Sequence, residues 1–219
     1  MTRAELAKMI DHTLLRPDAT QREVAALCAD AVEHGFANVS VNPAWVQFCA
    51  RSLVGSGVGI DATVGFPLGA NTTYIKIEEA RDAMQNGATE LDMVINVGAL
   101  KSGDYEYVAD EIQSAVRIAR NVNVKIILET GYLTDTQIRT VCDMSMRAGA
   151  AFVKTSTGFG PSGAKVPDVA LMRSVVGDKM GVKAAGGIRS YTDAMAMIGA
   201  GANRLGTSAG VTILHYLPE

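Results

Sequence analysis

Residues 151–187 read AFVKTSTGFGPSGAKVPDVALMRSVVGDKMGVKAAGG and contain one complete unit of the pattern from which the fold class can be predicted. The unit begins and ends with short β-rich runs, at 151–156 and 181–185. The segment between these runs has helical spacing and closes at Gly177, a residue type that favours a left-handed C-terminal cap. Strand, helix, glycine and strand in this order are typical of parallel α/β proteins.

The same unit repeats along the rest of the chain. Its β-rich runs predict eight strands, at residues 10–14, 37–41, 59–64, 90–96, 122–130, 151–156, 181–185 and 204–207. The segments between them have helical periodicity; Val24, Leu27, Ala31 and Val32, for example, are expected to share one buried helix face. A short helix over residues 3–9 is expected before the first strand.

Two architectures share this pattern, the closed barrel and the open doubly wound sheet. An open sheet usually carries a G-x-G-x-x-G nucleotide turn after its first strand, whereas RPDAT (16–20) follows the first run here and contains no glycine. Eight units without a linker or a change of composition favour an α/β fold of the TIM (β/α)8 barrel type, with a short N-terminal extra helix. The chain of 219 residues is near the lower limit of about 200 for such a barrel, so we expect one domain over residues 1–219.

Charge and composition exclude several classes of partner. Lys and Arg number 20 against 23 Asp and Glu, a net charge of −3, whereas non-specific nucleic-acid binding needs a basic surface. No apolar run approaches the roughly 20 residues that span a bilayer, so no membrane partner is expected. The three cysteines, Cys28, Cys49 and Cys142, form no C-x-x-C pair and suit a reducing compartment. We therefore expect a cytoplasmic protein.

Charged residues interrupt strands that a barrel buries on both faces and that should be almost wholly apolar. Asp92, Lys154 and Lys183 lie in three such runs. Side chains alternate along a strand, and the apolar neighbours of these residues are expected to pack on the outer helices. The sequence therefore predicts that all three charged side chains point into the barrel.

Two buried lysines close to a carboxylate are expected to be chemically active. Burial and a second ammonium group both lower the pKa of a lysine, and a partly neutral lysine attacks carbonyl groups to form a Schiff base. The alternative is a structural ion pair without chemistry. The presence of three such residues in one barrel favours the chemical interpretation over this alternative. Lys125, at the start of its strand, is expected to have a structural or snorkelling role, and Glu129, at the end of that strand, to reach the site or orient a loop.

Glycine-bearing turns follow the last two strands, in KAAGG (183–187) and GTSAG (206–210). Glycine lets backbone N–H groups approach an anion, a following helix N-terminus favours negative charge, and these two loops form the recurrent phosphate site of TIM barrels. TSTG (155–158) offers further hydroxyl groups and a flexible turn. The alternative is that these glycines serve only the geometry of tight turns.

Metal chemistry has little support, because His12, His34 and His215 lack metal-binding spacing, and we expect neither a metal nor another cofactor. On the first strand, His12 is a weak candidate to line the site. Asp11, Thr13 and, after the sixth strand, Thr157 are further candidates to line it.

Three motifs together resemble the deoxyribose-phosphate aldolases, a family of Schiff-base aldolases built on a TIM barrel. They are DMVIN (92–96), FVKTSTG (152–158) and VKAAGGIR (182–189), each at a strand end. The resemblance extends from IDHTL (10–14) almost to the C-terminus.

The resemblance implies reversible cleavage of 2-deoxy-D-ribose 5-phosphate into acetaldehyde and D-glyceraldehyde 3-phosphate, in deoxyribose phosphate catabolism. In the family pattern Lys154 would form the Schiff base, Lys183 would keep Lys154 neutral and join in proton transfer, and Asp92 would be the general acid and base. The implied phosphate ligands are Gly158, Gly186, Gly187, Gly206 and Ser208. The implied partners are a phosphorylated sugar and aldehydes, and a homodimer or higher homo-oligomer is also expected.

The chain departs from the family pattern at Phe159, where some members have a lysine close to the phosphate. Lys165 or Arg189 would then supply the positive charge. Two rival functions remain open: a Schiff-base aldolase with a different donor, and a barrel that binds a phosphorylated ligand without covalent chemistry. A metal-dependent aldolase is disfavoured because the chain has no histidine cluster.

Overall fold

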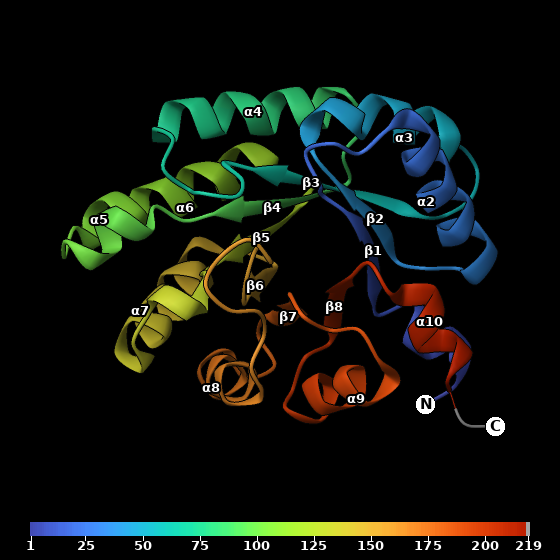
Figure 1. Cartoon of the computed structure of the whole chain (residues 1–219). Coiled ribbons are helices and arrows are strands. Elements are labelled where there is room, and N and C mark those ends of the chain that lie inside the picture. Colours follow the sequence, from blue (N-terminus) through green and yellow to red (C-terminus); the bar gives the residue numbers. More distant parts are fainter. Residues whose placement is uncertain (218–219) are drawn as a thin grey trace.

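The repeated strand–helix unit closes into a TIM barrel, as the sequence predicts. The structure, a computed structural model, describes residues 1–217 and shows eight parallel strands surrounded by helices (Figure 1). The strands are β1 (Ile10–Leu14), β2 (Asn38–Val41), β3 (Gly59–Val64), β4 (Glu90–Val94), β5 (Asn123–Ile127), β6 (Phe152–Lys154), β7 (Gly181–Ala185) and β8 (Arg204–Thr207). Each strand pairs with the next, and β8 pairs with β1 in parallel, which closes the barrel.

Helices follow the strands and cover the outside of the barrel. They are α1 (Arg3–Ala7), α2 (Gln21–His34), α3 (Val46–Ser52), α4 (Thr73–Gln85), α5 (Val97–Lys101), α6 (Tyr105–Ala119), α7 (Asp135–Ala148), α8 (Val166–Val176), α9 (Tyr191–Gly199) and α10 (Gly210–His215). Two 3-10 turns, η1 (Pro43–Trp45) and η2 (Thr130–Tyr132), complete the set. Within residues 1–217, none of these helices combines the length and the apolar character needed to cross a bilayer.

The N-terminal extra helix is present as α1, although it ends at Ala7 instead of residue 9. Thr2 caps it through a capping box, in which the Glu5 N–H donates to Thr2 Oγ1 at 3.2 Å and the Thr2 N–H donates to Glu5 Oε2 at 2.7 Å. Leu6 and Ala7 are buried, and α1 packs against α10.

The helix faces largely follow the predicted periodicity. Val24, Leu27 and Ala31 of α2 are buried, and Gly35 ends the helix with a left-handed cap at φ 68°. Val32 is 47% exposed, so its assignment to the buried face is wrong. Successive helix residues differ by about 100° around the axis, which turns Val32 away from the stripe that contains Ala31.

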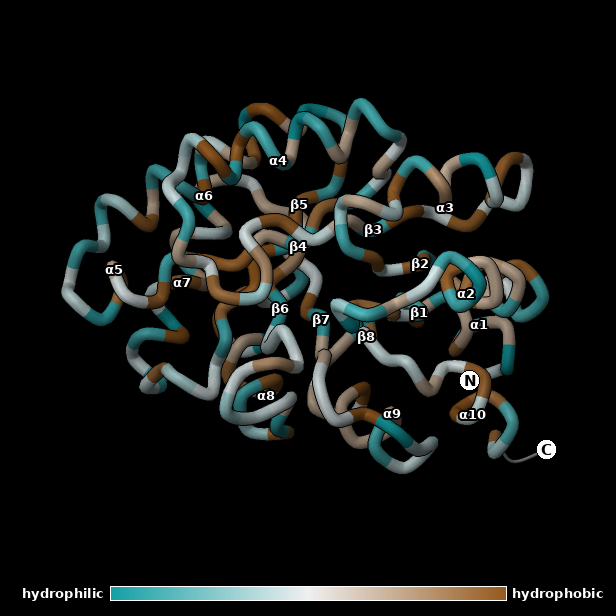
Figure 2. Tube along the Cα trace, turned by 45° about the horizontal axis from the view of Figure 1, so that its top comes forward, coloured by the Kyte–Doolittle hydropathy of each residue, from teal (hydrophilic) through white to brown (hydrophobic). Residues whose placement is uncertain are grey.

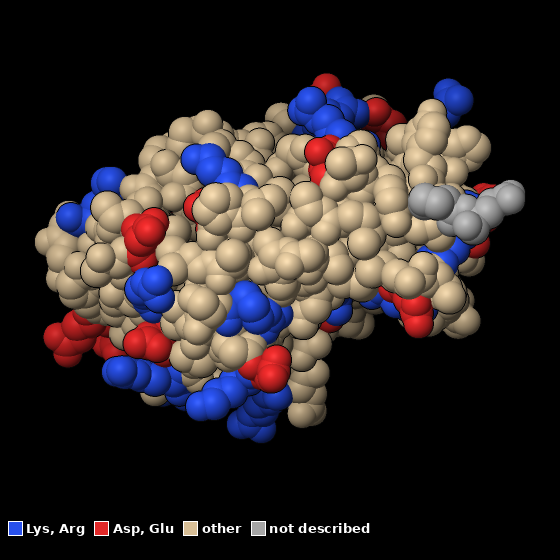
Figure 3. Space-filling view, turned by 90° about the horizontal axis from the view of Figure 1, so that it is seen from below, with Lys and Arg blue, Asp and Glu red and all other residues tan. Residues whose placement is uncertain are grey.

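The apolar core lies between the barrel and the helices, and a polar centre lies inside the barrel. Leu91 and Met93 of β4 are buried among apolar side chains, while Asp92 between them faces the barrel axis. Figure 2 shows hydrophobic segments on the central strands and hydrophilic segments on the outer turns of the helices. On the face seen in Figure 3, basic side chains lie beside acidic ones instead of forming one continuous basic surface.

Three strands end earlier than the sequence predicts. β4, β5 and β6 end at Val94, Ile127 and Lys154, and the residues that follow form the lead into the loops. Inter-strand hydrogen bonds continue there, for example from the Leu128 N–H to the Lys154 carbonyl at 2.9 Å and from the Thr155 N–H to the Lys183 carbonyl at 3.1 Å. These extended ends frame the mouth of the barrel at its carboxyl end.

Candidate active site

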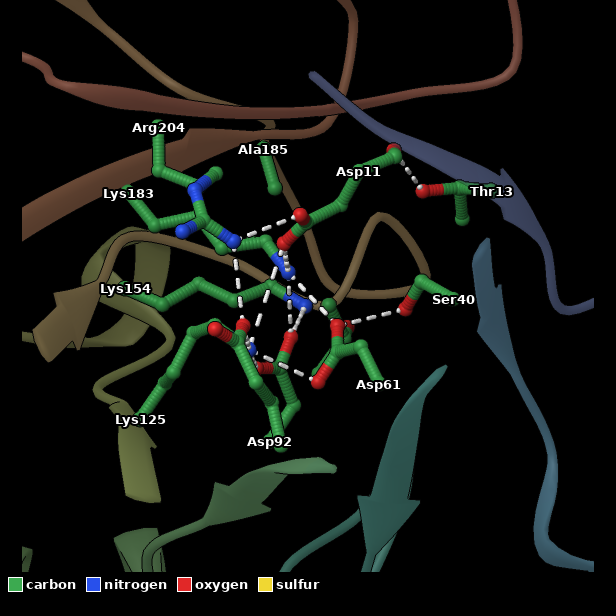
Figure 4. A network of polar contacts seen from close by, with 12 residues as sticks. Asp11, Thr13, Ser40, Asp61, Asp92, Lys125, Lys154, Lys183, Ala185 and Arg204 are labelled. Carbon is green, nitrogen blue, oxygen red and sulfur yellow. Dashed lines mark hydrogen bonds and ion pairs between the residues drawn. The ribbon is translucent and has the colours of Figure 1, made fainter. Parts of the chain in front are cut away.

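A cluster of ionic side chains fills the centre of the barrel (Figure 4). Its acidic members are Asp11, Asp61, Glu90 and Asp92, and its basic members are Lys125, Lys154, Lys183 and Arg204. Alternation along the strands points each of them inward, because the flanking apolar residues pack on helices. The predicted inward direction of Asp92, Lys154 and Lys183 is therefore observed, and the ion contacts join the three.

Lys154 stands at the carboxyl end of β6, where it contacts a single carboxylate. Its Nζ lies 2.6 Å from Asp92 Oδ2, and the side chain is 3% exposed. Burial is the largest influence on the pKa of Lys154 and lowers it. The Asp92 carboxylate raises this pKa and the Lys183 ammonium lowers it, and the net result is below the ordinary value. Lys154 is therefore the lysine of the pair that more readily becomes a neutral amine.

Lys183, its register partner on β7, has the opposite character. Its Nζ lies 2.5 Å from Asp11, 2.8 Å from Asp61 and 2.7 Å from Asp92. Burial alone would lower the pKa of Lys183, but the three carboxylates outweigh it and raise the pKa above its usual value. Lys183 is thus held as an ammonium close to Lys154.

Asp92 connects the two lysines. Its Oδ2 accepts hydrogen bonds from the Nζ of both Lys154 and Lys183, and its Oδ1 lies 3.0 Å from Lys125. Burial would raise the pKa of Asp92, but the three ammonium groups hold it well below its usual range. A charged carboxylate in contact with both lysines can receive or return a proton at Lys154 Nζ.

Asp61 was not among the predicted site residues, although the rule that identifies Asp92 applies to it equally. Asp61 lies inside the predicted strand 59–64 and points inward, where its oxygens lie 2.8 Å from Lys125 and 2.8 Å from Lys183. The Ser40 hydroxyl also donates to it at 2.8 Å. Burial, followed by the charge of Asp92, raises the pKa of Asp61.

Of the two roles expected for Lys125, snorkelling is wrong and a structural role fits. Its ammonium is fully buried, 2.8 Å from Asp61 and 2.6 Å from Glu90. Arg204, which was not a predicted site residue, lies 2.8 Å from Asp11 and 3.0 Å from Glu90. Glu90 and Arg204 are the first residues of β4 and β8, so these contacts close the amino end of the barrel.

A cavity of about 290 Å³ opens at the carboxyl ends of β1, β6, β7 and β8. Lys154, Thr13 and Thr157 line it, together with all five residues predicted to hold a phosphate, Gly158, Gly186, Gly187, Gly206 and Ser208. Three predicted site residues do not line the cavity and are linked to it only through Lys154. Asp92 contacts Lys154, Lys183 contacts Asp92, and Asp11 contacts Lys183. The lysine of lowered pKa and the glycine turns therefore share one cavity.

Three of the four glycines that line this cavity adopt backbone conformations that favour glycine. Gly158, Gly186 and Gly187 have φ values of 87°, 91° and 80°. A Cβ on Gly186 would lie 2.9 Å from the Cα of Gly163, so the close approach of the two loops also requires a glycine. The alternative of turn geometry thus accounts for part of the glycine pattern.

The helix N-terminus that follows Gly187 is less open to an anion than the sequence predicts. In α9 the Ser190 hydroxyl accepts from the Asp193 N–H at 3.1 Å, and Asp193 Oδ2 accepts from the N–H groups of Arg189 and Ser190 at 3.1 and 3.0 Å. This capping box occupies those backbone donors.

Two arginines supply positive charge at the cavity. Arg189, one of the two predicted candidates, lines it, whereas Lys165 precedes α8 and does not. Arg16 also lines the cavity and was missed in the RPDAT turn; it pairs with Asp18 at 2.7 Å and with Glu23. Phe159 forms part of the wall and packs edge-on against Phe66, with 5.6 Å between ring centroids.

His12 does not line the site. Since Asp11 points inward, His12 faces outward, where its Nε2 lies 3.6 Å from Asp30 and its ring packs on Phe36. Within the part of the chain that the structure describes, no three His, Cys, Asp or Glu side chains are arranged to hold a metal ion. The acidic groups of the central cluster instead contact lysine and arginine.

Comparison with known proteins agrees with this geometry. The family model described as DeoC/LacD family aldolase matches residues 6–215. The deoxyribose-phosphate aldolase of Caldanaerobacter subterraneus subsp. tengcongensis is 55% identical over 213 residues, which cover 96% of this chain and 92% of the relative. That of Streptococcus sanguinis is 54% identical over 210 residues, which cover 96% of each chain.

Solved structures show the same relationship. The deoxyribose phosphate aldolase of Aeropyrum pernix, described as tetrameric, superposes with a TM-score of 0.92 at 37% identity and covers 98% of this chain and 91% of its own. The match extends over nearly the whole barrel, including the three motifs on which the resemblance was based. By fold and by sequence, the chain belongs to the DeoC/LacD family of aldolases.

Proposed function

We propose that this aldolase reversibly cleaves 2-deoxy-D-ribose 5-phosphate into acetaldehyde and D-glyceraldehyde 3-phosphate through a Schiff base on Lys154. The observation that carries the proposal is the position of Lys154, a lysine of lowered pKa that lines the same cavity as the glycine turns. The deoxyribose-phosphate aldolases that are 54–55% identical to the chain support the choice of substrate.

In the proposed reaction the neutral Nζ of Lys154 attacks C1 of the open-chain sugar. Loss of the carbonyl oxygen as water leaves an iminium ion, which draws electrons from the C2–C3 bond as the C3 hydroxyl loses its proton. The bond breaks, glyceraldehyde 3-phosphate departs, and an enamine of acetaldehyde remains on Lys154. Protonation of the enamine at C2 and hydrolysis of the resulting iminium release acetaldehyde and return the free amine.

The neighbouring charges fit the proton transfers in this sequence. Asp92 lies 2.6 Å from Lys154 Nζ and is the proposed general acid and base. Lys183 stays an ammonium and disfavours a second positive charge on Lys154. Asp11, 2.5 Å from Lys183, acts through that lysine by raising its pKa.

The glycine turns are the proposed phosphate site. Gly158, Gly186, Gly187, Gly206 and Ser208 line one cavity and would present backbone and hydroxyl donors to the phosphate. Arg189 and Arg16, which line the same cavity, would balance its charge. Thr13 and Thr157 would contact the sugar or its phosphate.

The experiment that tests the proposal is trapping of the Schiff base. Acetaldehyde with sodium borohydride should add one reduced two-carbon group to Lys154, detected by peptide mass spectrometry, and deoxyribose 5-phosphate should compete. Lys154→Leu removes the amine but keeps a long aliphatic side chain, so the variant should fold while its cleavage rate falls by about 10³-fold or more.

Three results would contradict the assignment: no adduct, an adduct on Lys125, or full activity of the Lys154→Leu variant. An adduct on Lys154 without cleavage of deoxyribose 5-phosphate would favour a Schiff-base aldolase with a different donor. Loss of activity in EDTA would favour a metal-dependent aldolase.

We also propose that residues 1–219 act as one domain and that the chain forms a homo-oligomer. The tetrameric relative from Aeropyrum pernix supports self-association.

A further inference from the structure

Glu129 combines two costly features outside the central ionic cluster. Its backbone adopts the left-handed conformation, at φ 55° and ψ 63°, which is uncommon for residues other than glycine. Its side chain is only 3% exposed, and burial raises the pKa of its carboxyl group. Strained residues of this kind persist where the surrounding structure needs them, often at functional sites.

The side-chain hydrogen bonds of Glu129 are directed at the turn that follows Lys154. Its Oε2 accepts from the Thr157 N–H at 3.1 Å and also from the Thr157 hydroxyl. The same hydroxyl oxygen accepts from the Phe159 N–H at 3.0 Å. Its other oxygen, Oε1, has no hydrogen-bond partner among residues 1–217. One carboxylate oxygen therefore fixes Thr157 and, through it, Phe159, on either side of Gly158.

Gly158 also lies close to the turn after β7. A Cβ on Gly158 would lie 3.9 Å from the Cα of Gly186. Further along the same loop, the Ala164 N–H donates to the Gly186 carbonyl at 2.9 Å. The turn at 157–159 thus contacts the Glu129 carboxylate and lies close to Gly186. Gly158 and Gly186 both line the cavity that Lys154 lines.

The loop after β6 leaves room for the Glu129 carboxyl group at Gly160, which has no side chain. A Cβ on Gly160 would lie 2.7 Å from Glu129 Cδ and 2.8 Å from Oε1. A side chain at position 160 would therefore push the carboxyl group away from Thr157. The glutamate and the glycine fit each other, and among residues 1–217 no ion pair or hydrogen bond joins the Glu129 carboxyl group to Lys154.

From these contacts we propose that Glu129 is a positioning residue, which holds the 157–159 turn so that Gly158 and Gly186 grip the substrate's phosphate. The inference rests on the proposed function, because it concerns the phosphate half of that site. Loss of the Glu129 carboxylate should therefore reduce the cleavage of a phosphorylated substrate more than the cleavage of the same sugar without a phosphate.

The test compares cleavage of 2-deoxyribose 5-phosphate with cleavage of unphosphorylated 2-deoxyribose. Glu129→Leu removes the acceptor for two hydrogen bonds, so the ratio of kcat/KM for the two substrates should fall by about tenfold, mainly through KM for the phosphate ester. In Glu129→Gln the ratio should fall less, because the amide oxygen of the glutamine can still accept hydrogen bonds from Thr157. Glu129→Gly should lose the same selectivity as Glu129→Leu while relieving the left-handed backbone, which separates the carboxylate from the backbone strain.

Gly160→Ala should disturb the contact between Glu129 and Thr157 from the side of the loop. It should therefore lower the ratio of kcat/KM for the two substrates while Glu129 itself is unchanged. Gly199→Ala is the matched control, because a Cβ there meets open space, and its ratio should equal that of the unaltered enzyme. If Glu129→Leu does not fold, Gly160→Ala and Glu129→Gln decide the outcome.

An unchanged ratio in the folded variants, or an equal loss for both substrates, would overturn the proposal for Glu129. The acetaldehyde–borohydride adduct on Lys154 separates this failure from failure of the proposed function. If the adduct forms in every variant but the ratio does not move, only the role of Glu129 is refuted. If the unaltered enzyme neither forms the adduct nor cleaves the phosphate ester, the proposed function itself fails.

Discussion

Two lysines on adjacent strands, at paired positions in the register, have opposite pKa shifts. Lys154 and Lys183 are both buried, so burial acts on both in the same direction. The difference comes from the number of carboxylates each one contacts: Asp92 alone for Lys154, and Asp11, Asp61 and Asp92 for Lys183. The positions of a few oxygen atoms thus determine which lysine can lose its proton.

This difference predicts a pH effect of Lys183→Met. In the proposed mechanism Lys154 acts as the free amine, and the ammonium of Lys183 disfavours its protonation. Removal of that charge should raise the pKa of Lys154, so the acid limb of kcat/KM and of borohydride trapping should move to higher pH, by about one unit or more. The pH profile of each measurement checks the prediction.

Lys183→Arg is the control, since it keeps a positive charge and should leave the acid limb nearer its original position. Circular dichroism establishes that both variants fold. An acid limb that stays in place, or moves to lower pH, in folded Lys183→Met would contradict the role of Lys183.

Elements outside the barrel also position the site, as the carboxyl end of β4 illustrates. Lys76 of α4 and Glu111 of α6 are fully buried, with 2.6 Å between Lys76 Nζ and Glu111 Oε1. Lys76 donates to the Val94 carbonyl at 2.8 Å, and Glu111 Oε2 accepts from the Asn96 N–H at 2.9 Å. Two helices therefore hold the backbone that continues directly from Asp92.

We predict that breaking this pair costs more than replacing it. Glu111→Leu should lower the free energy of unfolding by about 3–5 kcal/mol, because it leaves a buried ammonium without its partner. The double variant Lys76→Met/Glu111→Leu should recover much of that loss, since apolar side chains of similar size tolerate burial. Urea denaturation at neutral pH measures both. A double variant no more stable than the single variant would show that the pair is not coupled.

At the scale of the whole molecule, the prediction concerns assembly. The match with the related protein from Aeropyrum pernix, which is described as tetrameric, extends over nearly the whole chain. The outer helices also expose apolar side chains, such as Tyr74 and Ile75 of α4, which are 70% and 49% exposed. Light scattering should therefore give a molecular mass at least twice that of a single chain. A monomer at every concentration measured would contradict the proposed homo-oligomer.

The closed barrel also explains why some elements were predicted well and others were not. Strand–helix units are local patterns, so all eight strands were located, whereas the ends of β4, β5 and β6 depend on where neighbouring strands stop pairing. Val32 was misplaced for a similar reason, because the width of a helix's buried face depends on what packs against it.

Alternation along a strand is a local property with a period of two, so the sequence was sufficient to predict the barrel and the inward direction of Asp92, Lys154 and Lys183. The glycine turns were also recognisable. Gly158, Gly186 and Gly187 have left-handed conformations that restrict the residue type, and a Cβ on Gly206 would lie only 3.0 Å from that of Ala185. Which charges meet depends on the tertiary structure. Asp11 and Arg204 are separated by 193 positions and are brought to 2.8 Å by the pairing of β1 with β8. Pairing of neighbouring strands and closure of the barrel set such distances, which determine the pKa shifts in the central cluster. Pairing of β5 with β6 likewise brings Glu129 to Thr157.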